Sequence, residues 1–238
     1  MTKPLLLLLP GLMCDAAVWQ GQAEAFASAY DVRTPNFHGF ASFDAMAKAA
    51  LDLTDGRDFA LAGHSMGGRV AMQVAAMVPQ RVQRLALLDT AAHPPAPIET
   101  ERRLGLVEIG EREGIEAVIQ AWLPPMIAPN RHDDRALWDA IAAMLRRAGV
   151  QTLRRQQHAL LNRPDGYAQL DTVRAPTAFI VGALDGWSTP QQHRDMQAHV
   201  PGSTLTVIDN CGHMAPMEAP DAVNAAFAQW LDMRLERE

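Results

Sequence analysis

Short apolar runs alternate along the chain with longer segments in which apolar residues recur at helical spacing. Six runs are expected to form strands: Pro4–Leu9, Val32–Thr34, Phe59–Ala62, Arg84–Leu88, Thr177–Val181 and Ser203–Ile208. Several are almost wholly apolar, which is typical of parallel strands covered by helices on both faces. Helices are expected between them, at Asp15–Tyr30, Phe43–Thr54, Ser65–Val78, Pro190–Val200 and Ala219–Leu235. This alternation predicts an α/β fold with a mainly parallel, doubly wound sheet of about six strands.

The alternation stops between residues 93 and 173, where no strand is expected. Helical periodicity in this stretch covers Glu99–Arg112, Ile115–Trp122, Asp133–Ala148 and Val150–Leu161, and prolines 124, 125 and 129 interrupt it. We therefore expect two units. Residues 1–92 and 174–238 form an α/β core, and residues 93–173 form a helical cap inserted into that core.

Composition narrows the class of function. The chain has 238 residues, 48% of them hydrophobic, which is enough for a sizeable core. A formal net charge of −6 disfavours nucleic acid as a partner, because binding it requires a basic face. No apolar run reaches the roughly 20 residues of a membrane span, and Leu5–Leu9 is shorter than a signal-peptide hydrophobic region of roughly 7–15 residues. We expect a cytoplasmic monomer or homodimer that acts on a small molecule.

Ser65 is the first candidate for chemistry. It stands in Gly63-His64-Ser65-Met66-Gly67, directly after an apolar run and at the start of a helical stretch. In that context a Gly-x-Ser-x-Gly turn holds the serine in a strained conformation at the end of a strand. The helix N-terminus below it supplies N–H donors for developing negative charge. The motif therefore predicts a nucleophilic serine.

A serine hydroxyl becomes a good nucleophile when a histidine removes its proton and an acid orients that histidine. His213 is the one histidine after the last predicted strand, and Asp185 follows the strand before it. Ser65, Asp185 and His213 thus appear in the chain order of hydrolases with this type of turn. Asp89, after Arg84–Leu88, is the alternative acid, although capping the start of the insertion suits it better.

Four segments, Leu9–Met13, Gly63–Gly68, Gly182–Asp185 and Gly212–Pro220, together resemble the α/β-hydrolase superfamily over nearly the whole chain. The resemblance is closest to the small capped carboxylesterases and the enol-lactone hydrolases. It implies an oxyanion hole formed by the backbone N–H groups of Leu12 and Met66, with Pro10 where relatives usually carry a histidine. Many relatives carry a hairpin before the first strand; because the first predicted strand here begins at Pro4, we expect a sheet without that hairpin. Glu218 is expected to anchor its loop rather than to react.

The predicted reaction is hydrolysis of a carboxylic ester or lactone through an acyl-enzyme, with no metal or organic cofactor. The same triad also serves C–C bond hydrolysis, perhydrolysis and cofactor-free lyase or oxygenase chemistry, because the pocket and cap decide the reaction. A non-enzymatic binding protein on this fold is the remaining alternative. A panel of esters and β-diketones would separate these possibilities.

Candidates for the substrate pocket are Met13, His64, Trp187 and Met214, which lie near the active-site motifs in sequence, and the cap residues Trp122 and Met126. Methionine and aromatic side chains facing a cleft would make it apolar and adaptable. The cap also concentrates arginines with His158, namely Arg146, Arg147, Arg154, Arg155 and Arg163. One of these turned into the pocket would favour an acid-bearing substrate, whereas a solvated charged face is the ordinary interpretation.

Cys14 and Cys211 are too few for a disulfide scaffold and lack metal-ligand spacing. Both fall in loops that are expected to flank the active site. Their oxidation or alkylation would then block activity, or they are two reduced, buried residues without a role in chemistry; the second interpretation is the simpler one.

Overall fold

The computed structural model describes residues 2–235, and its centre is a six-stranded sheet. The strands are β1 (Leu5–Leu9), β2 (Asp31–Arg33), β3 (Phe59–His64), β4 (Val82–Leu88), β5 (Thr177–Gly182) and β6 (Thr204–Ile208). Their order is β2-β1-β3-β4-β5-β6, and every neighbouring pair is parallel. The predicted α/β class is confirmed, and the sheet is wholly rather than mainly parallel.

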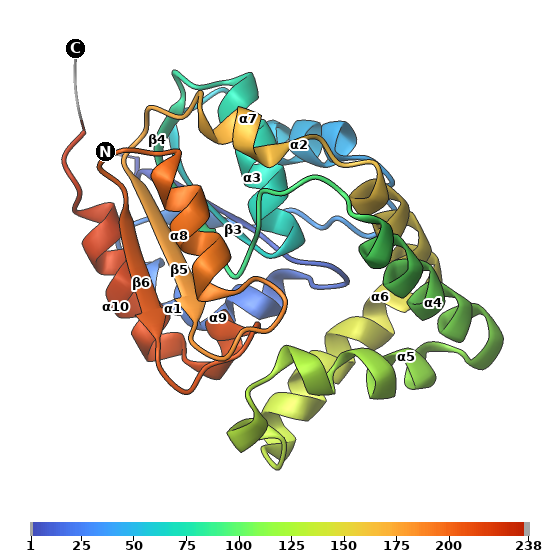
Figure 1. The fold of residues 1–238 in the computed structure, drawn as a ribbon. Coiled ribbons are helices and arrows are strands. Elements are labelled where there is room, and N and C mark those ends of the chain that lie inside the picture. The colour runs from blue at the N-terminus through green and yellow to red at the C-terminus, as the bar shows by residue number, and fades with distance from the viewer. Residues whose placement is uncertain (1, 236–238) are drawn as a thin grey trace.

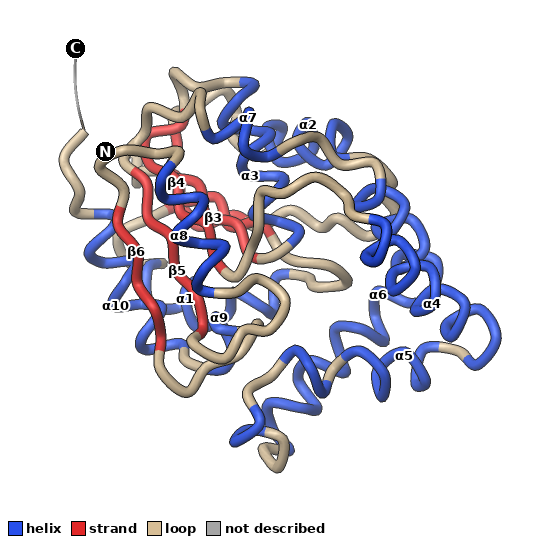
Figure 2. Tube along the Cα trace, in the orientation of Figure 1, coloured by secondary structure: helices blue, strands red, loops and turns tan. Residues whose placement is uncertain are grey.

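Helices cover both faces of the sheet (Figure 2). The core helices are α1 (Gln20–Phe26), α2 (Phe43–Asp52), α3 (Met66–Met77), α8 (Pro190–Ala198) and α10 (Pro220–Leu231). α1 packs against α10, and α2 packs against α3. The chain moves along the sheet in one direction from β1 to β2 and in the opposite direction from β2 to β3. Because crossovers between parallel strands are right-handed, α1 and α2 lie on opposite faces. The central strands are therefore buried on both sides, and every residue of Leu5–Leu9 is at most 1% exposed.

The strandless insertion folds into α4 (Pro97–Glu113), α5 (Ile115–Trp122) and α6 (Arg135–Leu161), with short 3-10 helices at Pro124–Met126 and Pro129–Arg131. These three helices pack against one another and stand beside the carboxyl ends of the strands (Figure 1). The sequence predicts two helices where α6 runs. They meet at Gly149, whose φ of 71° breaks the helical path in a conformation that favours glycine.

Short elements account for most differences from the predicted helices. α7 (Gly166–Leu170) and α9 (Ala215–Glu218) were not expected, and α7 packs against core helix α3 although it lies within residues 93–173. The segment Asp15–Tyr30 divides into a 3-10 helix at Ala16–Trp19 and α1. No strand precedes β1 within residues 2–235, and over the same range no helix is long and apolar enough to cross a membrane.

Candidate active site

Ser65 lies in a sharp turn between β3 and α3 with φ of 54° and ψ of −118°, a strained backbone for a residue with a side chain. Its N–H donates to Leu88 O at 2.9 Å, which fixes the turn to β4. A Cβ on Gly67 would lie 2.2 Å from Leu9 O, and one on Gly63 would lie 2.3 Å from Gly67 O. The two glycines are therefore required for the close approach that lifts the serine above the sheet.

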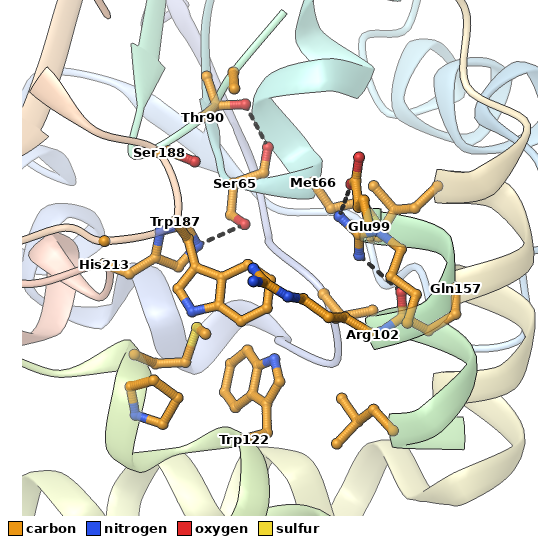
Figure 3. Close-up of a pocket in the computed structure, with 18 of the residues that line it drawn as sticks. Ser65, Met66, Thr90, Glu99, Arg102, Trp122, Gln157, Trp187, Ser188 and His213 are labelled. Atoms are coloured by element: carbon orange, nitrogen blue, oxygen red, sulfur yellow. Dashed lines mark hydrogen bonds and ion pairs between the residues drawn. The ribbon is translucent and has the colours of Figure 1, made fainter. Parts of the chain in front are cut away.

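Ser65, His213 and Asp185 form one hydrogen-bonded chain. His213 Nε2 lies 2.8 Å from Ser65 Oγ, and His213 Nδ1 lies 2.8 Å from Asp185 Oδ2. Figure 3 shows the Ser65 hydroxyl directed at the imidazole. The three residues come from the ends of β3, β5 and β6, and parallel strands present these ends at one edge of the sheet. The histidine is thus placed to take the serine proton, and the aspartate to hold the imidazole.

Asp185, rather than Asp89, contacts the imidazole. Burial raises the pKa of Asp185, but the charge of His213 and hydrogen bonds from His213, Ser188 and Trp187 outweigh it and hold that pKa below its usual value. Asp89 instead accepts N–H groups of Gly182 at 3.0 Å and Ala215 at 3.2 Å. Burial and the charge of Asp185 raise the pKa of Asp89 well above its usual value. Asp89 therefore has a structural role beneath the site, where it accepts hydrogen bonds from these two backbone groups.

The loop that carries His213 is fixed at several points. Glu218 accepts N–H groups of Gly212 at 3.1 Å, Met214 at 3.0 Å and Ala128 at 2.7 Å, so it has the anchoring role expected of it. His64 Nε2 donates to His213 O at 2.7 Å. Burial and the charge of His213 lower the pKa of His64 to about 3, so that imidazole stays neutral.

Leu12 and Met66 line the same cavity as Ser65. Met66 is the first residue of α3, where an N–H group has no acceptor within the helix. Within residues 2–235, neither Leu12 N–H nor Met66 N–H donates to another backbone group. The adjacent Met13, with φ of 57°, donates its N–H to Gln156 Oε1 at 2.7 Å, which ties this loop to α6. Both predicted donors are thus free beside the serine.

The cavity above Ser65 has a volume of about 480 Å³, within the usual size of a small-molecule site. Trp122, Met126 and Trp187 line it, as predicted from the sequence. The predicted lining residues Met13, His64 and Met214 do not line it. They are at most 1% exposed because their side chains pack into the core below the loops, so this part of the prediction is wrong.

A model of the alpha/beta hydrolase family matches residues 6–226. The chain belongs to this alpha/beta hydrolase family. It is 25% identical to N-formylmaleamate deformylase of Pseudomonas putida, with 95% of this chain and 88% of that protein covered. It is also 25% identical to a pimeloyl-[acyl-carrier protein] methyl ester esterase of Nitrosomonas europaea, with 94% of each covered.

Solved alpha/beta hydrolase structures agree with this assignment. A thermophilic esterase from Thermogutta terrifontis, with malate bound, has a TM-score of 0.87 and 29% identity, covering 97% of this chain and 90% of that one. The enol-lactonase of Burkholderia xenovorans LB400 also has a TM-score of 0.87, at 21% identity, covering 98% and 93%. At 21% identity, the likeness to the enol-lactonase shows a shared fold and no more.

The five cap arginines that the sequence singles out in this alpha/beta hydrolase do not line the cavity. Arg163 is fully buried and pairs with Glu99 at 2.6 Å. The other four lie in contacts at the surface: Arg146 with Glu116 at 2.7 Å, Arg147 with Asp15 at 2.7 Å, Arg154 with Glu111 at 4.0 Å, and Arg155 with Gly39 O at 3.2 Å. His158 is exposed. The hypothesis that one of these arginines enters the pocket is therefore wrong.

Cys14 and Cys211 are both buried and unpaired. Their thiols donate to backbone carbonyl groups, Cys14 to Leu12 O and Cys211 to Gly212 O. Burial, reinforced by Asp15, raises the pKa of Cys14 to about 12, and burial among carboxylates raises the pKa of Cys211. Since the thiolate is the reactive form, the geometry favours two inert cysteines.

Arg69 is one of the charged cavity residues that reasoning from the sequence missed. Arg69 lines the cavity although it belongs to core helix α3 rather than to the cap. It is the single charged residue in Met66–Met77, a helix otherwise almost wholly apolar, and it follows Ser65 by one helical turn. A charge in so apolar a helix was the available signal.

Proposed function

We propose that the protein is a serine hydrolase that cleaves a carboxylic ester or lactone through an acyl-enzyme. The observation that carries this proposal is the hydrogen-bonded chain Ser65–His213–Asp185, with both side-chain contacts at 2.8 Å. The strained turn at Ser65 and the free N–H groups beside it support the same chemistry. The esterase relatives add support at the level of reaction class.

In the first half-reaction, Ser65 Oγ attacks the carbonyl carbon of the substrate while His213 Nε2 takes the hydroxyl proton. The N–H groups of Leu12 and Met66 hold the oxyanion, a contribution of about 3–4 kcal/mol per donor in comparable sites. His213 then gives its proton to the leaving alcohol, which departs and leaves an acyl group on Ser65. Asp185 stabilises the imidazolium through these steps.

In the second half-reaction, a water molecule loses its proton to His213 and attacks the acyl carbonyl carbon. Collapse of the tetrahedral intermediate returns the proton to Ser65 and releases a carboxylic acid. The atoms balance as one ester and one water converted into one acid and one alcohol; a lactone gives both on one molecule.

Replacing Ser65 by alanine tests the proposal. The variant should keep its thermal unfolding temperature within a few degrees, while turnover of p-nitrophenyl esters falls by about 10⁴-fold or more. A panel that includes β-diketones separates ester from C–C bond hydrolysis. Undiminished ester turnover by a folded Ser65→Ala protein would refute the assignment, and so would turnover of β-diketones alone.

A further inference from the structure

The end of the cavity away from the triad is strongly basic. Figure 3 shows Ser65 and His213 on one side and Glu99 and Gln157 on the other, with the Arg102 side chain extending into the space between them. Arg69, Arg102 and Arg103 all line the cavity, and Glu99 is the one carboxylate among the described residues that line it. The balance of charge in this part of the site is therefore positive.

Glu99 does not neutralise Arg69 or Arg102, because both of its carboxylate oxygens already pair with other arginines. Glu99 Oε1 pairs with Arg103 at 2.6 Å, and Oε2 pairs with the fully buried Arg163 at 2.6 Å. Arg103 also donates to Gln157 Oε1 at 2.7 Å, which fixes its orientation. Both oxygens of the carboxylate thus serve two other arginines, and none is left for Arg69 or Arg102.

Arg69 is a buried arginine without an anionic partner in the described part of the chain. Its side chain is 8% exposed, yet among residues 2–235 it has no ion pair within 4 Å, and its one hydrogen bond runs from Nη1 to His93 O at 3.0 Å. Burial and the nearby charge of Arg163 lower the pKa of Arg69 to about 9, so the guanidinium remains charged at pH 7. A buried cation without an anionic partner is costly, and a guanidinium matches a carboxylate in shape and charge.

Arg69 is also placed correctly relative to the nucleophile. It follows Ser65 by four residues on the helix that begins at the active-site turn, a rise of roughly 6 Å. Both line one cavity of about 480 Å³. A small molecule can therefore put a carbonyl group at Ser65 and an anionic group at Arg69. Arg102, on α4, lines the same cavity and has no ion pair among the described residues.

We propose that Arg69, assisted by Arg102, binds a carboxylate of the substrate, so that the preferred substrates are small esters or lactones that carry a second, ionised carboxyl group. This inference rests on the proposed hydrolase function and specifies its substrate class. The arginines that bind this carboxylate lie on α3 and α4 and are not among the five between residues 146 and 163 that the sequence singled out. The ordinary alternative is that Arg69 has only a structural role and stabilises the start of the cap through its hydrogen bond to His93 O.

A matched pair of substrates tests the preference. Monoethyl succinate and ethyl succinamate differ only in carboxylate against amide, and ethanol release reports their hydrolysis. A charge-assisted hydrogen-bonded contact predicts that kcat/KM favours the acid by about 10- to 100-fold. Arg69→Gln and the exposed Arg102→Gln should each reduce that ratio at least several-fold, mainly through KM. Arg112→Gln, an exposed arginine on the same helix α4, should leave the ratio unchanged.

Binding without turnover separates this inference from the hydrolase assignment. In Ser65→Ala protein, calorimetry should detect succinate at millimolar concentration, and a further Arg69→Gln change should weaken binding about tenfold or more. Ser65-dependent hydrolysis without preference for the acid would overturn the carboxylate site and leave the hydrolase standing. Failure of succinate to bind would overturn it as well. A lost preference in the Arg112→Gln control would show a non-specific charge effect, which also contradicts it.

Discussion

Replacing Asp185 by asparagine should disable His213 because of how the two carboxylate oxygens are used. Oδ1 accepts N–H groups of Trp187 at 2.8 Å and Ser188 at 2.9 Å, and Oδ2 faces His213 Nδ1 at 2.8 Å. Asparagine has one oxygen, which must stay opposite the two backbone donors. Its NH2 group then faces His213, so the imidazole must accept at Nδ1 and carry its proton on Nε2. In that tautomer Nε2 cannot take the proton of Ser65.

The expected loss follows from this change of tautomer. We expect kcat for a p-nitrophenyl ester to fall about 10⁴-fold, which is about 5 kcal/mol of activation free energy. Stability should change by no more than about 2 kcal/mol, because both backbone hydrogen bonds to the side-chain oxygen remain. Turnover at saturating substrate and urea unfolding measure the two effects separately.

Asp89→Asn is the matched control, because this carboxylate lies beneath the site without touching the imidazole. Its oxygens accept N–H groups of Gly182 and Ala215, and an asparagine would turn its NH2 toward one of these donors. The cost should appear as about 1–3 kcal/mol of stability, while kcat stays within about tenfold of the wild type. A nearly normal kcat for Asp185→Asn, or a larger loss of kcat for Asp89→Asn, would show that Asp185 does not orient His213.

Three further predictions concern residues around the site that take no part in the reaction. Gly67→Ala should lower the unfolding temperature sharply because its Cβ has no room, whereas Gly105→Ala, open on all sides within α4, should raise stability by up to about 1 kcal/mol; calorimetry compares the two. Burial raises the pKa of Glu99, but its two arginine partners lower it to about 2. Its contribution of about 3 kcal/mol is therefore present above about pH 4.5 and lost as the pH falls toward 2, so the destabilisation of Glu99→Gln in denaturant unfolding should shrink over that range; a constant difference would contradict the assignment. Iodoacetamide should leave Cys14 and Cys211 unmodified and ester turnover unchanged in the folded protein, and inactivation would show that a thiol is accessible.

The layers of the fold were predictable from the sequence because several strands are short and almost wholly apolar. Leu5–Leu9 and Phe59–Ala62 have this form, and the pattern suffices to place helices on both faces. α7 and α9 are too short, at five and four residues, for helical periodicity to identify them. Their positions depend on tertiary packing, such as the contact of α7 with α3.

The candidate triad was predictable because each member follows a strand, and parallel strands end at one edge of the sheet. The pocket was not, since sequence proximity to the triad says nothing of the direction of a side chain. Met13 adopts a positive φ that carries its side chain into the core, and the partners of Arg146 and Arg147 lie 30 and 132 residues away in sequence. Long-range ion pairs therefore decide which arginines reach the cavity.

Labelling with a fluorophosphonate shows whether Ser65 is the nucleophile, because the reagent reacts with a serine only when that serine is activated. We expect one adduct per chain, located at Ser65 by peptide mass spectrometry, absent from Ser65→Ala and formed much more slowly by Asp185→Asn. A folded, wild-type protein that stays unlabelled, or an adduct at another residue, would contradict the assignment of Ser65 as the nucleophile.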